Sequence, residues 1–481
     1  MTMYELIKGE EKDAGIGDPN RNLLTIEGRE CFEKDIELGR QNSMLKPNAG
    51  DANKATAVLA AGGESVSKRR LVSLDVFRGI TVALMILVDD AGGMFPSINH
   101  SPWDGVTLAD FVMPFFLFIV GLSLALAYKI IMGLHQDMAL HGKTAQYKKL
   151  PCRIDATKKA VLRALKLFAV GLVLQGGYFH GLNNLTYGVD INQIRWMGVL
   201  QRIAIAYLLS ALCEIWIKGD DNIDSGLSLL KKYRYQWMVA FVLTTTYLTL
   251  LYGLYIPDWE YQIFNGSSSA APKIFSVKCG VRGDTGPACN AVGMIDRKIL
   301  GLQHLYKRPI YARTKQCSIN SPDYGPLPPD APSWCQAPFD PEGLLSSVMA
   351  IVTCLIGLHY GHIIVHFKDH KERIFQWMIP ASGLVVTGFV LDFFGMHLNK
   401  ALYTFSYTCV TAGAAGILFT GTYVLVDVYG YRRPTMILEW MGMHALMIYI
   451  LAACNILPVL LQGFYWKKPE NNILRLIGIG S

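Results

Sequence analysis

Long apolar blocks separated by short polar loops constrain the fold of this chain most strongly. Crossing about 30 Å of hydrocarbon takes about 20 helical residues. Charged residues make up only 17% of the 481 residues, whereas soluble domains carry about 25%. The sequence therefore predicts an all-α integral membrane protein, a polytopic bundle of about nine transmembrane helices in a lipid bilayer. The expected spans are 71–90, 105–130, 159–179, 195–217, 236–256, 343–365, 374–395, 402–428 and 435–461.

The basic residues alternate between loops and so predict an orientation. The loops 91–104 and 180–194 contain no Lys or Arg, whereas the positions 68–70 and the loop at 143–159 are rich in them. By the positive-inside rule the N-terminus is cytosolic and the large loop 257–342 is luminal. Because the formal net charge of +7 comes largely from such loops, it indicates orientation and not nucleic-acid binding.

The same pattern divides the chain into parts. We expect residues 1–70, which are polar and mixed in charge, to form a mostly disordered cytosolic tail. The transmembrane domain is expected over 71–461, with the loop 257–342 inserted into it. Residues 462–481 are expected to form a short luminal tail.

The large loop has the composition of a segment in an oxidising compartment. It contains four cysteines, which predict two disulfides in any of three connectivities. Sequons at Asn265 and Asn184 predict glycosylation on the same side of the membrane. The four cysteines are Cys279, Cys289, Cys317 and Cys335.

Polar residues gather at the predicted luminal ends of the spans. Charged groups in apolar segments usually face a cavity and mark a functional path. We expect these residues to line a polar chamber in which His100 accepts protons, with a nearby carboxylate raising its pKa. The residues of this set are Asp89, His100, Asp110, Gln201, Arg202, Asn399 and Lys400.

A second polar set lies toward the predicted cytosolic side. It includes Arg78 in the first span and Arg163 and Lys166, one turn apart, in the third. These side chains could bind the phosphates of a cytosolic cofactor, or they could extend to lipid phosphates. The sequence contains no HExxH motif and no zinc-type CxxC pair, and we expect no metal.

Several ordered motifs resemble the heparan-α-glucosaminide N-acetyltransferase family over about residues 70–450. They are Leu74-Asp75-Val76-Phe77-Arg78-Gly79, His100-Ser101-Pro102-Trp103-Asp104-Gly105 continuing to Asp110, Gly198-Val199-Leu200-Gln201-Arg202, Ile295-Asp296-Arg297, Asp340-Pro341-Glu342-Gly343 and Leu398-Asn399-Lys400. The segment from Gly325 to Cys335 further resembles the plant branch of that family.

The resemblance implies a multipass enzyme that passes an acetyl group from cytosolic acetyl-CoA to a luminal glycan or small-molecule acceptor. In the animal enzyme the acceptor is the terminal glucosamine of heparan sulfate, in lysosomes. The resemblance therefore suggests a lysosome-type or vacuole-type endomembrane, and we also consider a homodimer. The active-site histidine of the family falls on His100, and a family asparagine eleven residues earlier falls on Asp89. The family core usually has a tenth span, which this chain is expected to lack.

Two mechanisms and two other functions stay open at this level. His100 could be a general base, or it could carry the acetyl group covalently, with Asp89 or Asp110 orienting its ring. The oxyanion could be stabilised by Gln201, Arg202 or Asn399, and Lys400 is a further candidate for binding the substrate or the oxyanion. A proton-coupled transporter that uses Asp89, His100, Asp110 and Arg202 as a relay is the alternative from another class. A non-catalytic membrane scaffold is the third.

Overall fold

The protein is mostly helical, as the apolar blocks predict. The computed structural model describes residues 71–92, 95, 97–139, 145–176, 194–217, 225–263, 273–306 and 310–454. Its α-helices are α3 (Val72–Ala91), α4 (Leu108–Ala139), α5 (Ala145–Gly176), α6 (Val199–Trp216), α7 (Gly226–Lys232), α8 (Arg234–Gly253), α9 (Ala291–Leu300), α10 (Leu344–His366), α11 (His370–Phe393), α12 (Phe405–Tyr423), α13 (Met436–Met443) and α14 (Ala445–Ala453). The tails at 1–70 and 462–481 lie outside the described residues.

Five of the described helices are long and apolar enough to cross a membrane, and a bent pair would make six. The five are α4 over Leu108–Tyr128, α6, α10, α11, and α12 continued by the π-helical turn η6 (Val424–Val428). The predicted number of nine is therefore not confirmed. Helices do form at the other expected spans, but α3 and α5 carry several charges, and threonines and tyrosines dilute the hydropathy of α8.

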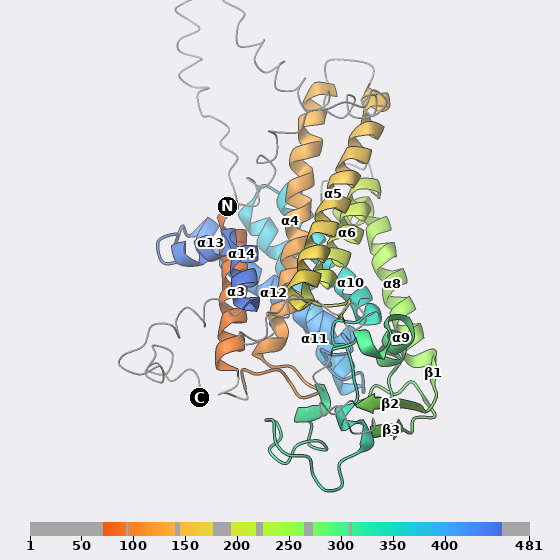
Figure 1. Cartoon of the computed structure of the whole chain (residues 1–481). Coiled ribbons are helices and arrows are strands. Elements are labelled where there is room, and N and C mark those ends of the chain that lie inside the picture. The colour runs from red at the N-terminus through yellow and green to blue at the C-terminus, as the bar shows by residue number, and fades with distance from the viewer. Residues whose placement is uncertain are drawn as a thin grey trace, which may run out of the picture.

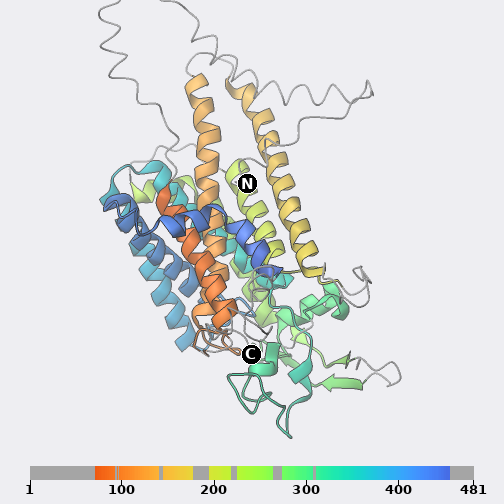
Figure 2. The same ribbon diagram turned by 60° about the vertical axis from the view of Figure 1, so that its left-hand side comes forward.

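Helix α10 forms the centre of the bundle. It contacts α4, α6, α8 and α12, and 83% of its apolar window is buried, against 17% for α11 at the periphery. Figures 1 and 2 show these helices side by side, with α4 and α5 extending beyond the others at one end. At the opposite end lies the segment 254–342, which we call the disulfide-bearing segment.

Glycines allow α4 and α10 to approach closely. A Cβ atom on Gly121 would lie 1.9 Å from the carbonyl oxygen of Cys354, and one on Gly357 would lie 2.1 Å from that of Phe118. Neither position can accept a larger residue without moving a backbone, as is usual where small residues line a helix interface. This contact fixes the axial position of α4 relative to α10. The first turn of α4 carries a candidate site residue.

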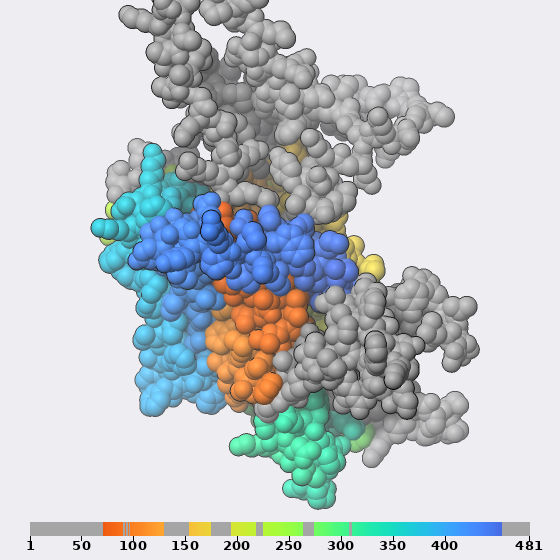
Figure 3. All heavy atoms as spheres, turned by 90° about the vertical axis from the view of Figure 1, so that its left-hand side faces the viewer, coloured from red at the N-terminus to blue at the C-terminus, as the bar shows by residue number. Residues whose placement is uncertain are grey.

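The last described helices form a bent pair. The axes of α13 and α14 differ by 75°, and both contact α3. Figure 3 shows this pair lying across the face of α3. The expected ninth span at 435–461 is thus interrupted at His444, and its part beyond residue 454 lies outside the described residues.

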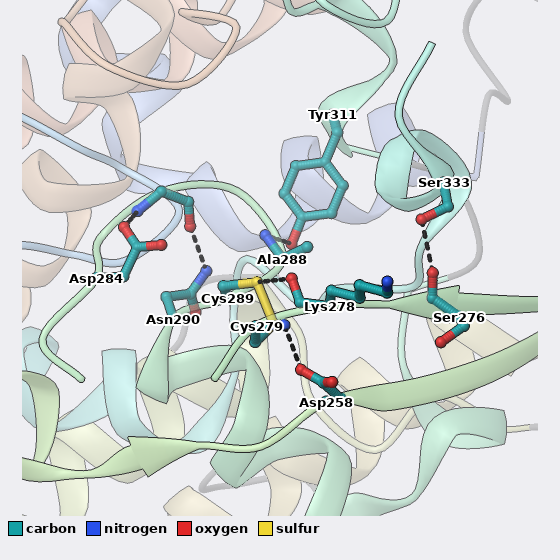
Figure 4. The surroundings of a disulfide bond; sticks show 11 residues. Asp258, Ser276, Lys278, Cys279, Asp284, Ala288, Cys289, Asn290, Tyr311 and Ser333 are labelled. Atoms are coloured by element: carbon teal, nitrogen blue, oxygen red, sulfur yellow. Dashed lines mark hydrogen bonds between the residues drawn. A yellow bond between two sulfur atoms is a disulfide. The ribbon is translucent and has the colours of Figure 1, made fainter. Parts of the chain in front are cut away.

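The disulfide-bearing segment is held together by two short sheets and two disulfides. Strand β1 (Tyr255–Ile256) pairs with β4 (Val281–Arg282), and β2 (Trp259–Ile263) pairs with β3 (Lys273–Val277), both antiparallel. The 3₁₀ helices η3 (Leu302–His304), η4 (Ile310–Arg313) and η5 (Ser333–Gln336) follow α9. The disulfides join Cys279 to Cys289 (Figure 4) and Cys317 to Cys335. They confirm the prediction of two disulfides and identify one of the three connectivities.

Candidate active site

The loop that carries His100 is anchored to the disulfide-bearing segment. Trp103 is buried, with its ring 5.3 Å from Tyr311 and 5.8 Å from Phe339. Its indole N–H donates a hydrogen bond to the carbonyl of Thr285 at 3.2 Å. The loop is therefore part of a folded core, and the position of His100 is set by packing around Trp103.

Asp110 holds the ring of His100 from the first turn of α4. Its Oδ2 accepts hydrogen bonds from the backbone N–H and the hydroxyl of Thr107, both at 3.0 Å, and from the N–H of Ser101 at 3.1 Å. This is the reach-back arrangement of a capping box, with Thr107 just before the helix. Oδ1 lies 2.7 Å from Nδ1 of His100. Because an ionised carboxylate can only accept, Nδ1 carries the proton and the lone pair of a neutral ring lies on Nε2.

A second loop closes over the same ring. The N–H of Gly105 donates to the carbonyl of Leu398 at 2.7 Å, and the amide of Asn399 donates to Asp104 at 3.3 Å. These bonds place the Nζ of Lys400 2.8 Å from Nδ1 of His100, 3.2 Å from Nε2, and 3.6 Å from Oδ1 of Asp110. Residues separated by 300 positions in the chain thus form one cluster of three charged or titratable groups.

The electrostatic balance of this cluster is opposite to the sequence-based expectation. The pKa of His100 is lowered from its usual value, first by burial and then by the positive charge of Lys400. The hydrogen bond and charge of Asp110 and the charge of Glu342 oppose this shift. The expected rise was wrong because it counted the carboxylates and neither the burial of the ring nor the ammonium of Lys400. The side chain nevertheless remains 43% exposed, so part of the ring is open to solvent.

Two arginines fix the segment just before α10 beside this cluster. Arg195 donates from Nε to Asp340 at 2.9 Å and also pairs with Glu342. The guanidinium of Arg202 donates to the carbonyl of Pro341 at 2.7 Å and to the hydroxyl of Ser346. Arg202 is 2% exposed. Its hydrogen bonds hold the turn at 340–346 in place, so Arg202 stabilises the segment beside the His100 cluster.

The other predicted residues of the chamber are placed differently. Gln201 is buried between α5 and α6. Its amide lies so close to Gly171 of α5 that a Cβ atom at this glycine would clash with it. Asp89 is exposed in the last turn of α3. The carboxylate against the ring of His100 is therefore that of Asp110.

Arg313 is a site residue that the sequence did not reveal. It lies at the end of η4 and donates to the backbone carbonyl of His100 at 2.8 Å and to Asn99 at 3.2 Å. It also donates to the carbonyl of Pro322 at 2.9 Å, so it links the disulfide-bearing segment to the His100 loop. An arginine in a polar loop has no local pattern that would single it out.

The predicted cofactor-binding cations do not form one cluster. Arg78 donates to Asp75 at 2.8 Å, to Ser123 of α4 at 3.1 Å and to the carbonyl of Gly442 in α13. Arg163 is half-buried, with its guanidinium 5.8 Å from the ring centre of Tyr207, midway along α6. Lys166, one turn further along α5, is exposed. Arg163 therefore faces the bundle and Lys166 faces away from it.

A buried pair that the sequence did not predict lies toward the end opposite the disulfide-bearing segment. Nε2 of His362 lies 2.8 Å from the carboxylate of Glu214, which also accepts from Gln236 at 3.0 Å. The ring of Tyr233 stacks on that of His362 at 3.6 Å. Within the described ranges no group of three or more His, Cys, Asp or Glu residues could hold a metal ion. The sequons at Asn184 and Asn265 lie outside those ranges.

The chain is similar to one family of known proteins. The model of the family "Heparan-alpha-glucosaminide N-acetyltransferase, catalytic" matches residues 70–219, the part that carries His100 and Asp110. The match supports assignment to this family over that part of the chain. The curated relatives of that name from mouse and human are each 26% identical to it.

These two relatives are longer than this chain. The mouse alignment covers 452 residues, which are 89% of this chain and 61% of the relative. The human alignment covers 454 residues, 90% of this chain and 59% of the relative. The chain thus spans about three-fifths of the length of the curated relatives it matches.

Proposed function

We propose that this protein is a membrane-bound acetyltransferase in which His100 assists transfer of an acetyl group to an amine. The contact between His100 and Asp110 carries the proposal, since a buried carboxylate fixes the proton on Nδ1 and leaves the lone pair on Nε2 of a partly exposed ring. This is the arrangement by which a carboxylate orients a catalytic histidine in acyl-transfer enzymes. The match to the N-acetyltransferase family model and the similarity to the mouse relative support the same reaction class.

The chemistry follows from the free lone pair on Nε2. In direct transfer, Nε2 removes a proton from the acceptor amine as its nitrogen attacks the thioester carbonyl. The carbon–sulfur bond then breaks, and the thiolate of coenzyme A leaves and takes up a proton. In the covalent variant Nε2 itself attacks the carbonyl and passes the acetyl group to the amine in a second step. Asp110 stabilises the positive charge that the ring acquires in either case.

Residues around the ring could stabilise the oxyanion of the tetrahedral intermediate. Gln201, Arg202 and Asn399 are the candidates from the sequence. Arg202 already donates to Pro341 and Ser346, and the amide of Asn399 donates to Asp104. Gln201 is buried against Gly171 of α5. Of the three, Asn399 is the best candidate, because it precedes Lys400 in the loop that touches the ring.

The donor and acceptor would approach from opposite faces of the membrane. The proposal places acetyl-CoA on the cytosolic side, with its phosphates on Arg78, Arg163 or Lys166. The acceptor, a luminal amino sugar or related glycan, would reach His100 from the side of the disulfide-bearing segment, in an endomembrane of the lysosomal or vacuolar type. Two disulfides in that segment support an oxidising lumen.

Binding of coenzyme A to the purified protein tests this proposal. We expect wild type to bind acetyl-CoA, and Arg163→Ala to weaken binding about tenfold or more, because a partly buried charged hydrogen bond contributes about 1.5–3 kcal/mol. Lys166→Ala should have the smaller effect, since this side chain is exposed. Lys371→Ala, an exposed lysine in the first turn of α11, is the control.

Isothermal titration with acetyl-CoA, and with acetate as the negative ligand, measures these affinities. An Arg163→Ala variant with wild-type affinity would remove this arginine from the cofactor site. A folded wild-type protein that does not bind acetyl-CoA would contradict the transferase and favour the proton-coupled transporter.

A further inference from the structure

Lys400, a candidate from the sequence for binding the substrate or the oxyanion, places its charge directly against the ring of His100. Its ammonium lies 2.8 Å from Nδ1 and 3.2 Å from Nε2. The lone-pair directions of the two ring nitrogens diverge, so one ammonium cannot lie along both. Since Nδ1 already donates its proton to Asp110, Lys400 acts on the ring chiefly through its charge.

We propose that Lys400 is a positioning residue that keeps the imidazole of His100 unprotonated at pH values at which an ordinary histidine is protonated. The proposal rests on the proposed function, because it assigns a role to Lys400 at the same histidine.

The charges of the cluster support this role. When the ring is neutral, the negative charge of Asp110 and the positive charge of Lys400 compensate each other. The side chain of Asp110 is fully buried. A proton on Nε2 would leave one uncompensated positive charge in a partly buried site, within 3.2 Å of an ammonium. Lys400 thus opposes protonation where Asp110 alone would favour it.

The other groups that face the ring do not cancel this effect. Glu342, before α10, is paired with Arg195, and Arg313 donates to the backbone carbonyl of His100. Asp104 bonds to Asn399 across the two loops. With all of these in place, the pKa of His100 is lowered, with burial as the first cause and Lys400 as the second.

The consequence concerns the working pH of the enzyme. An unperturbed histidine has a pKa of about 6.5, so at a pH of about 5 most of such rings are protonated and can neither accept a proton nor attack a carbonyl. A ring held neutral by a fixed ammonium keeps its lone pair there. Removing the charge should therefore impair the site in acid far more than near neutral pH.

The reaction of His100 with diethyl pyrocarbonate tests this without requiring any acetyl transfer. Of the two forms of an imidazole, the reagent modifies only the neutral one, and mass spectrometry of the peptide containing His100 measures the rate. Lys400→Met should slow labelling at a pH of about 5.5 by up to about tenfold for each unit that the pKa rises, with little change at a pH of about 8. Lys400→Arg, which keeps the charge, should label like wild type. Lys400→Gln, which keeps a donor without the charge, should behave like Lys400→Met.

The controls separate a charge effect from unfolding. Lys298→Met removes an exposed lysine from α9 and should leave the profile of His100 unchanged. Exposed His370 in α11 reports reagent activity within each sample. If Lys400→Met does not fold, the comparison of Lys400→Gln with Lys400→Arg decides the same question.

Equal pH profiles of His100 labelling in wild type, Lys400→Gln and Lys400→Arg would overturn the proposal. The acid limb of the acetyl-transfer rate should shift to higher pH in the neutral variants only. If labelling responds to Lys400 but wild type transfers no acetyl group, the proposed function fails and the charge role stands. If wild type transfers the acetyl group and the pH profile of His100 labelling is the same in all Lys400 variants, only this inference fails.

Discussion

Replacing His100 with alanine should lower the rate of acetyl transfer by about 10²–10⁴-fold if the ring is a general base, and by more if it carries the acetyl group. The ring has 43% of its side chain exposed and is held at Nδ1 by Asp110, so its removal eliminates the lone pair on Nε2 without opening the core around Trp103. Affinity for acetyl-CoA should stay within about twofold, because the proposed phosphate contacts lie elsewhere.

The matched control is His397→Ala. This histidine lies three residues before Lys400, and its side chain is 58% exposed and pairs only loosely with Asp392, at 3.5 Å. The measurement is the transfer of labelled acetyl from acetyl-CoA to glucosamine, with binding and thermal unfolding measured on the same samples. A His100→Ala variant that binds acetyl-CoA and transfers acetyl at the wild-type rate would remove His100 from the mechanism.

Asp110→Asn should have the second-largest effect, about 10²–10⁴-fold in kcat with a nearly unchanged KM for acetyl-CoA. An asparagine has the shape of the carboxylate but not its charge, and its amide can donate to the ring. Nδ1 would then no longer be the obligatory proton donor, and the developing positive charge on the ring would lose its partner.

Asp110 also caps α4, and this second role needs its own control. Thr107→Ala removes one hydrogen bond to the same carboxylate and should cost about 1 kcal/mol of stability, the usual loss at a helix cap. If Thr107→Ala lowers kcat as much as Asp110→Asn does, capping and not the contact with His100 explains the effect. Rates of both variants are to be compared at a temperature at which both are folded.

The apolar blocks predicted the helical bundle well because their signal is local. Each expected span contains a helix, and the ends of α6, α10 and α11 agree with the prediction within about four residues. The number of spans is harder to predict, because α3 and α5 contain charged side chains that a bundle can bury or direct to an interface. The 75° break between α13 and α14 also has no strong local signal.

The candidate site was only partly predictable, for the same physical reason. His100 and Asp110 lie ten residues apart at the start of a helix, so their contact follows from local structure. Lys400 and Arg313 reach His100 from loops 300 and 213 residues away, and such pairings are set by the tertiary fold. The expected sign of the pKa shift at His100 was wrong for the same reason, since burial of the ring, the larger cause, and the charge of Lys400, the second, both depend on the tertiary fold.

Acetyl transfer across a sealed membrane tests the central claim most directly. Vesicles with the cytosolic face outward would be loaded with glucosamine and given labelled acetyl-CoA outside. The account predicts labelled N-acetylglucosamine inside intact vesicles from cells that express wild type, and none above background with His100→Ala. Label that reaches glucosamine only after the vesicles are permeabilised, or equally with His100→Ala, would contradict it.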